Sequence, residues 1–116
     1  MTAQIIDGKQ TASEIYETLR NKVSTFPSKP KLAIILVGND EASLIYVRNK
    51  IKAAERIGID TELHHLSEHT EETEVLHLID NLNADSQTNG IIVQLPLPEH
   101  LNTNKIINRI LPTKDV

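Results

Sequence analysis

The sequence predicts an α/β fold, a three-layer α/β/α sandwich around a mainly parallel sheet, and two observations support this. Apolar runs at residues 31–37, 61–66 and 90–95 alternate along the chain with longer stretches in which apolar residues recur at helical spacing. Such alternation is typical of a parallel sheet covered by helices on both faces. The chain has 116 residues with no internal repeat and no linker-like tract, so we expect a single domain over residues 1–116.

The first thirty residues predict one strand and one helix. Residues 5–6 are a short apolar pair that favours a strand. Residues 11–25 predict a helix because Ile15, Leu19 and Val23 recur at helical spacing. Prolines then interrupt the pattern before the next element begins.

The segment 31–37 is continuously apolar after its first residue, which is typical of a strand buried on both faces in a parallel sheet. Residues 41–57 follow as a long amphipathic helix, and Gly58 stands where a glycine often ends a helix. The next run, 61–66, contains more polar residues, so we expect this strand nearer to an edge of the sheet.

A third helix is predicted to open at residues 70–72, where acidic side chains favour a helix N-terminus. Its inward-facing residues are Val75, Leu76, Ile79 and Leu82. The strand at 90–95 is stopped by prolines, and a last short helix at 104–110 precedes Pro112.

Composition excludes several classes of function. The formal net charge is −4 and there is no basic stripe, so nucleic acid is not an expected partner. The longest apolar run is too short to span a membrane, and no signal peptide is visible. The absence of cysteine excludes disulfides and cysteine metal sites and fits a cytoplasmic protein. His64 and His65 would point to opposite faces of a strand, so no metal is expected there.

The helix at 41–57 carries three chemically useful side chains on one side. Ser43, Tyr46 and Lys50 are spaced i, i+3, i+7, directly after a buried strand. Ligands of open parallel sheets bind at the carboxyl ends of the strands. A hydroxyl, an aromatic ring and an amine are therefore expected where a small molecule would bind.

Lys50 lies roughly 60° around the helix from Val47, on the flank of the apolar stripe. Partial burial there would lower its pKa toward the range useful for general acid–base chemistry. Alternatively, the lysine only lays its aliphatic stem over the core and keeps its amine in water. The spacing leaves both interpretations open.

A second segment, 90–98, places Gln94 at the end of a buried strand and two prolines after it. Gln94 would share the crevice with Tyr46 and Lys50, and its amide can bond an amine or a ligand. It could equally be a polar cap on the strand end. The four glycines form neither a G-x-G-x-x-G pattern nor a P-loop, so no nucleotide phosphate cradle is visible.

Together these two segments resemble the catalytic domain of the bifunctional methylene-tetrahydrofolate dehydrogenase/methenyl-tetrahydrofolate cyclohydrolase family. The family pattern V-G-x-x-x-A-S-x-x-Y-V-x-x-K matches residues 37–50 without a gap. Its second signature, G-[IL]-[IL]-V-Q-L-P-L-P, matches residues 90–98. Residues 6–9 and 112–116 match too, so the resemblance covers essentially the whole chain.

The resemblance implies roles for the matched positions. Lys50 is similar to the catalytic lysine, and Gln94 to the partner that tunes it. Tyr46 corresponds to the ring that packs on the aminobenzoyl group of folate and is grouped with the catalytic residues. Ser43, Leu95 and Pro96 complete the substrate-binding set, with Ser43 as a lesser member.

The resemblance also implies that the chain is the N-terminal part of a longer enzyme. The family motif continues P-x-K-D-V-D-G, and this chain stops one residue before the second aspartate, which helps to hold the pterin ring. A Rossmann-type NADP domain would follow. The chain is therefore expected to lack the NADP site and dehydrogenase activity. The parent enzyme is expected to be a cytoplasmic homodimer of one-carbon metabolism, serving purine and amino-acid biosynthesis.

Two other classes of function are alternatives. A receiver-like signalling module would need a phosphoacceptor aspartate at the end of the third strand, but Gln94-Leu95-Pro96 occupies that position. The second alternative is a domain that binds folate without turning it over. Measurements of folate binding combined with turnover assays would separate this alternative from the enzyme.

Overall fold

A parallel sheet of three strands forms the centre of the part of the chain that the computed structural model describes, residues 30–115. The strands are β1 (Lys31–Val37), β2 (Asp60–Leu66) and β3 (Gly90–Val93), in the order β2-β1-β3. Both neighbours pair with β1 in parallel. The central position of β1 explains its continuous apolar sequence, and β2 lies at one edge of the sheet that residues 30–115 form, where its more polar composition predicts it.

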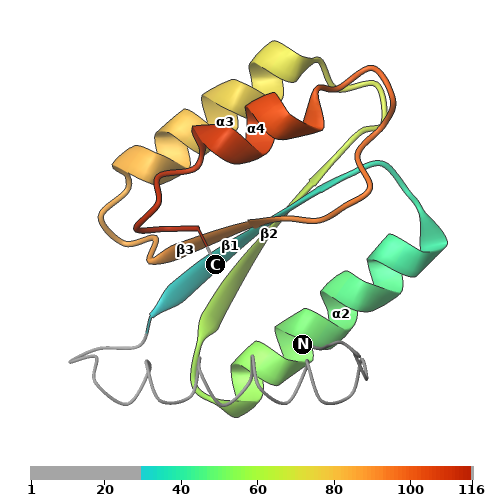
Figure 1. Cartoon of the computed structure of the whole chain (residues 1–116). Helices are drawn as coiled ribbons and strands as arrows, with labels where there is room; N and C mark the ends of the chain where they lie inside the picture. The colour runs from blue at the N-terminus through green and yellow to red at the C-terminus, as the bar shows by residue number, and fades with distance from the viewer. Residues whose placement is uncertain (1–29, 116) are drawn as a thin grey trace, which may run out of the picture.

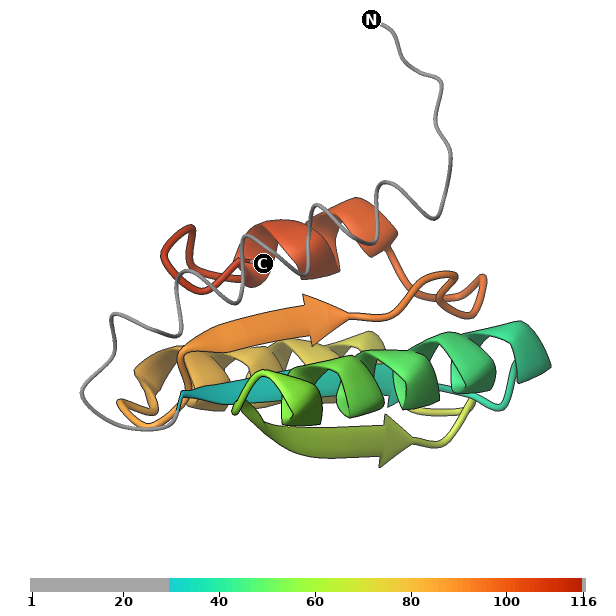
Figure 2. The same ribbon diagram turned by 90° about the horizontal axis from the view of Figure 1, so that it is seen from below.

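Helices cover the two faces of this sheet. Helix α2 (Glu41–Arg56) lies on one face, and α3 (Glu72–Ala84) and α4 (Thr103–Arg109) lie on the other (Figure 1). The strands lie between these helical layers in Figure 1, and Figure 2, seen from below, shows α2 in front of β1 and α3 behind the sheet. The described residues therefore form the predicted α/β/α sandwich.

The strand β1 contributes to a separate apolar core on each face because successive side chains point to opposite sides. Toward α2, three residues pack with Val47, Ala54 and Ile59: Leu32, Ile34 and Leu36. Toward α3 and α4, the other three pack with the inward residues of those helices: Ala33, Ile35 and Val37. The α3 residues predicted to face inward, Val75, Leu76, Ile79 and Leu82, are all buried.

Local signals fix the ends of α2. The carboxylate of Asp40 accepts a hydrogen bond from the backbone N–H of Ser43 at 2.9 Å and so caps the first turn. At the other end Gly58 has φ +84°, a conformation that side chains rarely adopt. The glycine that begins the turn into the helix, Gly38, has φ +93°.

The strand expected at 90–95 ends two residues earlier, at Val93. The backbone N–H of Gln94 still bonds Ile35 O at 2.9 Å, but the carbonyl of Leu95 accepts from the Gln94 side chain instead of pairing with a strand. Pro96 has no N–H to continue the ladder. The other strand and helix boundaries agree with the sequence to within one or two residues.

The strand expected at 5–6 and the helix expected at 11–25 lie outside the described residues. Between residues 30 and 115, no helix combines the length and apolar character needed to cross a bilayer.

Candidate functional site

The carboxyl ends of β1 and β3 bring the two sequence segments together. The turn after β1 leads directly into α2, which carries Ser43, Tyr46 and Lys50. Gln94 follows β3 immediately and still bonds β1 through its backbone. The structure thus places a residue from the second segment beside the helix of the first, as predicted from their positions at strand ends.

Lys50 and Gln94 are in direct contact. The Nζ atom of Lys50 donates to Oε1 of Gln94 at 2.8 Å. The side-chain nitrogen of Gln94, Nε2, donates to the carbonyl of Leu95 at 2.9 Å. Gln94 is only 6% exposed, so both ends of its amide are used in a buried setting. These two bonds present the amide oxygen, rather than the nitrogen, to Lys50.

Partial burial lowers the pKa of Lys50 below the usual lysine value. The cause is desolvation, which disfavours the charged ammonium. Lys50 as a whole residue nevertheless stays exposed. A lysine amine with a lowered pKa is suited to proton transfer.

Several residues close to Lys50 and Gln94 along the chain have exposed apolar side chains. Tyr46, one helical turn before Lys50, is 57% exposed, and Leu95, directly after Gln94, is 43% exposed. Pro96 is exposed as well. These side chains are accessible to a flat apolar ligand.

Ser43 differs from its neighbours because it is only 1% exposed. Its hydroxyl donates to the carboxylate of Asp40 at 3.0 Å and lies 3.4 Å from the carbonyl oxygen of Leu95. The sequence groups Ser43 with the substrate-binding residues but does not assign Asp40 to the site. The signal was present, because Asp40-x-x-Ser43 at the start of an amphipathic helix is typical of an N-cap.

The turn at Gly38 is tied to the end of β2. The backbone N–H of Gly38 donates to Leu66 O at 2.9 Å, and Nε2 of His65 bonds Gly38 O at 2.8 Å. His65 is thus engaged with the backbone of the turn that leads into α2. No group of three or more metal-binding side chains occurs within residues 30–115.

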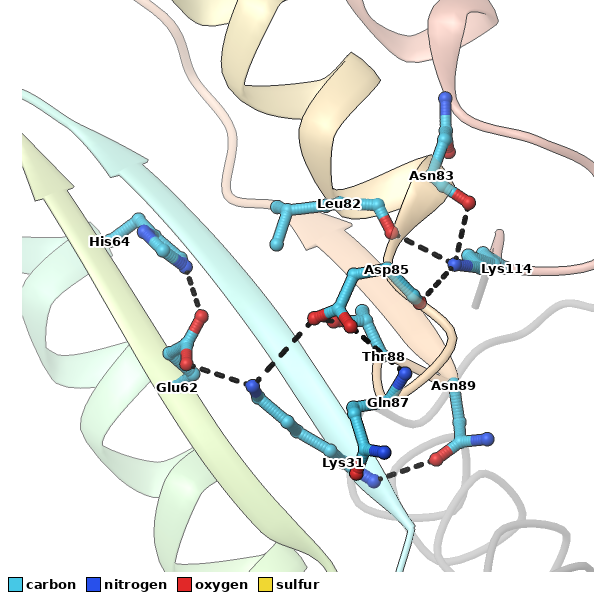
Figure 3. Close-up of polar contacts among 10 residues, drawn as sticks. All are labelled: Lys31, Glu62, His64, Leu82, Asn83, Asp85, Gln87, Thr88, Asn89 and Lys114. Atoms are coloured by element: carbon cyan, nitrogen blue, oxygen red, sulfur yellow. Dashed lines mark hydrogen bonds and ion pairs between the residues drawn. The ribbon is translucent and has the colours of Figure 1, made fainter.

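A separate polar cluster stabilises the opposite, amino-terminal end of the strands (Figure 3). Lys31 contacts Glu62 at 3.0 Å, and Glu62 in turn bonds Nε2 of His64 at 2.6 Å. Both neighbours lower the pKa of the Glu62 carboxyl, with Lys31 the larger cause. Because this cluster joins β1 to β2 away from Lys50, we assign it to stability rather than to the site.

A family model matches residues 6–116, and its description is the catalytic domain of tetrahydrofolate dehydrogenase/cyclohydrolase. The bifunctional protein FolD of Bacillus pumilus is 52% identical over 119 residues, covering 100% of this chain and 42% of that protein. FolD of Exiguobacterium sibiricum is 50% identical over 117 residues, covering 98% of this chain and again 42% of the relative.

Solved structures agree. The bifunctional enzyme FolD of Campylobacter jejuni superposes with a TM-score of 0.81 at 41% identity, over 94% of this chain and 40% of that one. The Trypanosoma brucei dehydrogenase-cyclohydrolase, solved with NADP cofactor and an inhibitor, gives a TM-score of 0.79 at 30% identity, over 99% of this chain and 41% of that one. The chain spans about 42% of the length of its curated relatives. It belongs to the tetrahydrofolate dehydrogenase/cyclohydrolase catalytic-domain family.

Proposed function

We propose that residues 1–116 form the folate-binding catalytic domain of a longer bifunctional enzyme. That enzyme oxidises methylene-tetrahydrofolate and hydrolyses the methenyl product to formyl-tetrahydrofolate. The observation that carries the proposal is the 2.8 Å contact between Lys50 and Gln94 at the carboxyl end of the sheet. Two comparisons support it: the chain belongs to the family, and it is 52% identical in sequence to the FolD protein of Bacillus pumilus.

Lys50 is proposed to move a proton in the hydrolytic step. Water adds its oxygen to the methenyl carbon, and the neutral amine of Lys50 accepts the proton that the water loses. The ring C–N bond then breaks as the hydroxyl of the adduct loses its proton to solvent and the Lys50 ammonium returns a proton to the leaving nitrogen, which gives the formyl group and restores the neutral amine. A lowered pKa increases the share of neutral amine near neutral pH, and the positive methenyl group disfavours the ammonium further.

Gln94 is proposed to hold the amine of Lys50 in position through its side-chain oxygen. Tyr46, Leu95 and Pro96 are proposed to pack against the rings of folate, because Tyr46 and Leu95 are large apolar groups left accessible beside the amine. Ser43 completes the proposed pocket. Because Ser43 is buried, we propose that it supports the residues that line the pocket rather than contacting the ligand itself.

The oxidative step requires a hydride acceptor, for which we propose NADP. The described residues do not fit its phosphates, because Gly38, Gly58 and Gly90 are separated along the chain and form no glycine-rich loop. We therefore place the NADP site outside residues 30–115 and derive no step through it. Residues 1–116 alone are expected to show no NADP-dependent turnover.

The proposal extends to the setting of the whole enzyme. We propose a cytoplasmic homodimer that acts in one-carbon metabolism and serves purine and amino-acid biosynthesis. This setting rests on the family resemblance alone, since the matched relatives are named only as bifunctional protein FolD. Nucleic acid, membrane and metal are not part of the proposal.

The experiment compares Lys50→Met with Lys52→Met in the longer enzyme. Lys52 lies on the same helix and is exposed, so the control removes the same charge without touching Gln94. We expect Lys50→Met to abolish cyclohydrolase turnover while the variant remains folded, and Lys52→Met to retain it. Lys50→Arg should not rescue, because a guanidinium stays protonated. Normal hydrolysis by folded Lys50→Met would remove Lys50 from the mechanism.

A further inference from the structure

We infer that Asp40 is a positioning residue that orients the Gln94 amide toward Lys50, acting through Ser43 and the carbonyl of Leu95. The orientation of Gln94 follows from contacts in the structure, and only its consequence for catalysis rests on the proposed function. Asp40 is exposed and lies at the start of α2, and no bond joins it directly to Lys50 or Gln94 among the described residues. Its influence must therefore pass through the residues between them.

The first step is the fixation of Ser43. One carboxylate oxygen of Asp40, Oδ2, accepts both the backbone N–H of Ser43 at 2.9 Å and its hydroxyl at 3.0 Å. A hydroxyl side chain otherwise rotates to suit its surroundings. Two bonds to the same carboxylate oxygen hold the Ser43 hydroxyl in one orientation, and Ser43 is only 1% exposed.

The second step joins Ser43 to Gln94 at a shared acceptor. The Ser43 hydroxyl lies 3.4 Å from the carbonyl oxygen of Leu95, which also accepts from Nε2 of Gln94 at 2.9 Å. The hydroxyl has one proton, which Asp40 binds at the shorter distance. The longer contact to Leu95 holds that carbonyl oxygen in place, and its second lone pair accepts from the Gln94 amide, so Asp40 fixes the Leu95 carbonyl through Ser43.

The third step reaches the lysine. With Nε2 of Gln94 bound to Leu95, only Oε1 is left to face Lys50, at 2.8 Å from Nζ. A flipped amide would set its oxygen against the Leu95 carbonyl and its nitrogen against the Lys50 ammonium, and both contacts would lack a donor–acceptor match. The order Asp40–Ser43–Leu95–Gln94 thus determines what Lys50 contacts.

The test follows the side-chain amide protons of Gln94 by NMR in the 116-residue chain without ligand. Asp40→Ala and Ser43→Ala should each shift these signals and speed their exchange with solvent roughly two- to tenfold, because the Leu95 carbonyl that accepts from Nε2 of Gln94 is then held less firmly. Asp40→Asn should restore the wild-type behaviour because its amide oxygen can still accept from Ser43. The double variant should differ little from either single one if both act along one path.

Asn102→Ala is the matched control. Asn102 caps α4 as Asp40 caps α2, by accepting from the backbone of Lys105 at 3.1 Å, and makes no bond to the site residues. It should leave the Gln94 signals unchanged although it also loses a cap. Unchanged Gln94 signals in Asp40→Ala or Ser43→Ala would overturn the inference, and so would an equal change in Asn102→Ala. A chain that fails to bind folate would contradict the proposed function without altering these readouts.

Discussion

Lys50 combines an exposed residue surface with an amine whose pKa is lowered by burial, and this leads to a direct prediction. In a chain labelled with ¹³C at the lysine side chains, NMR titration should show Lys50 losing its proton below the usual lysine pKa. Gln94→Leu should lower the pKa further, because the ammonium loses the oxygen that it donates to. A Lys50 pKa at or above the usual value would contradict the prediction.

The same shift has a consequence for stability. Between the lowered folded pKa and the usual unfolded pKa, the unfolded chain binds more protons at Lys50 than the folded chain does. The contribution of Lys50 to the free energy of unfolding therefore rises with pH in that window. Lys50→Met should remove this rise from urea denaturation measured across alkaline pH.

The residues of the site differ in how far sequence could assign them. Lys50 and Gln94 were placed together correctly because both follow buried strands whose carboxyl ends meet at one edge. The burial of Ser43 was not predictable, because a helical wheel does not show that the loop after β3 covers that face. The role of Asp40 requires knowledge of that same loop.

At the scale of elements, the two glycines that flank α2 offer a matched pair. Gly38 and Gly58 both have positive φ, so alanine should cost each about 1–2 kcal/mol of backbone strain. A Cβ on Gly38 would lie 3.6 Å from the Cβ of Glu68, an ordinary contact, and one on Gly58 would meet nothing within 4 Å.

The two variants should differ in function. Only Gly38 lies in the turn that sets the start of α2 and its Asp40 cap. Urea denaturation should give similar losses of stability for both alanine variants, and calorimetry should show weakened folate binding for Gly38→Ala alone. Equal folate affinity in the two variants would show that this turn does not position the site.

Helix α3 ends against Lys114, whose Nζ donates to the carbonyl oxygens of Leu82, Asn83 and Asp85, each at 2.8 Å (Figure 3). The carbonyls of Leu82 and Asp85 also accept from backbone N–H groups, so Lys114 adds a charged donor to a helix end that is already partly satisfied. We predict that Lys114→Met lowers the free energy of unfolding by about 1–3 kcal/mol, because three partly buried carbonyls lose a charged donor.

Lys105→Met is the control for this prediction. Lys105 forms a 3.3 Å ion pair with Glu72 and is 57% exposed, so its loss should cost less than about 1 kcal/mol. Urea denaturation measures both variants. Similar losses would show that the three carbonyl bonds add little beyond a surface ion pair.

Element positions were more predictable than element ends and neighbours. The strand 31–37 and the inward residues of α3 followed from apolar periodicity alone. The early end of β3 depends on a side-chain bond from Gln94, and the isolated bridge between Ile91 and Asp115 pairs segments that only the tertiary fold brings together. Periodicity contains no information on either feature.

At the scale of the whole molecule, the alternation of strands and helices predicts the three layers but not the strand order β2-β1-β3, which arises from long-range pairing. That order places β1 in the middle and its carboxyl end beside Gln94. The two cores share β1, so the described layers are expected to unfold together, and a ligand bound at the carboxyl end should stabilise all of them.

This coupling gives the last prediction. A folate that binds only the folded chain should raise the free energy of unfolding by about 2.7 kcal/mol at a ligand concentration one hundred times its dissociation constant. Tyr46→Ala should lose most of this gain at the same concentration, because the exposed ring is the proposed packing surface for folate. Ile45→Ala is the matched control, since Ile45 is 54% exposed against 57% for Tyr46 on the same helix, but points about 100° away. Thermal denaturation with and without folate measures the gain in each variant. If Ile45→Ala lost as much of the gain as Tyr46→Ala, the ring of Tyr46 would have no specific part in binding, and general apolar surface on α2 would explain the effect.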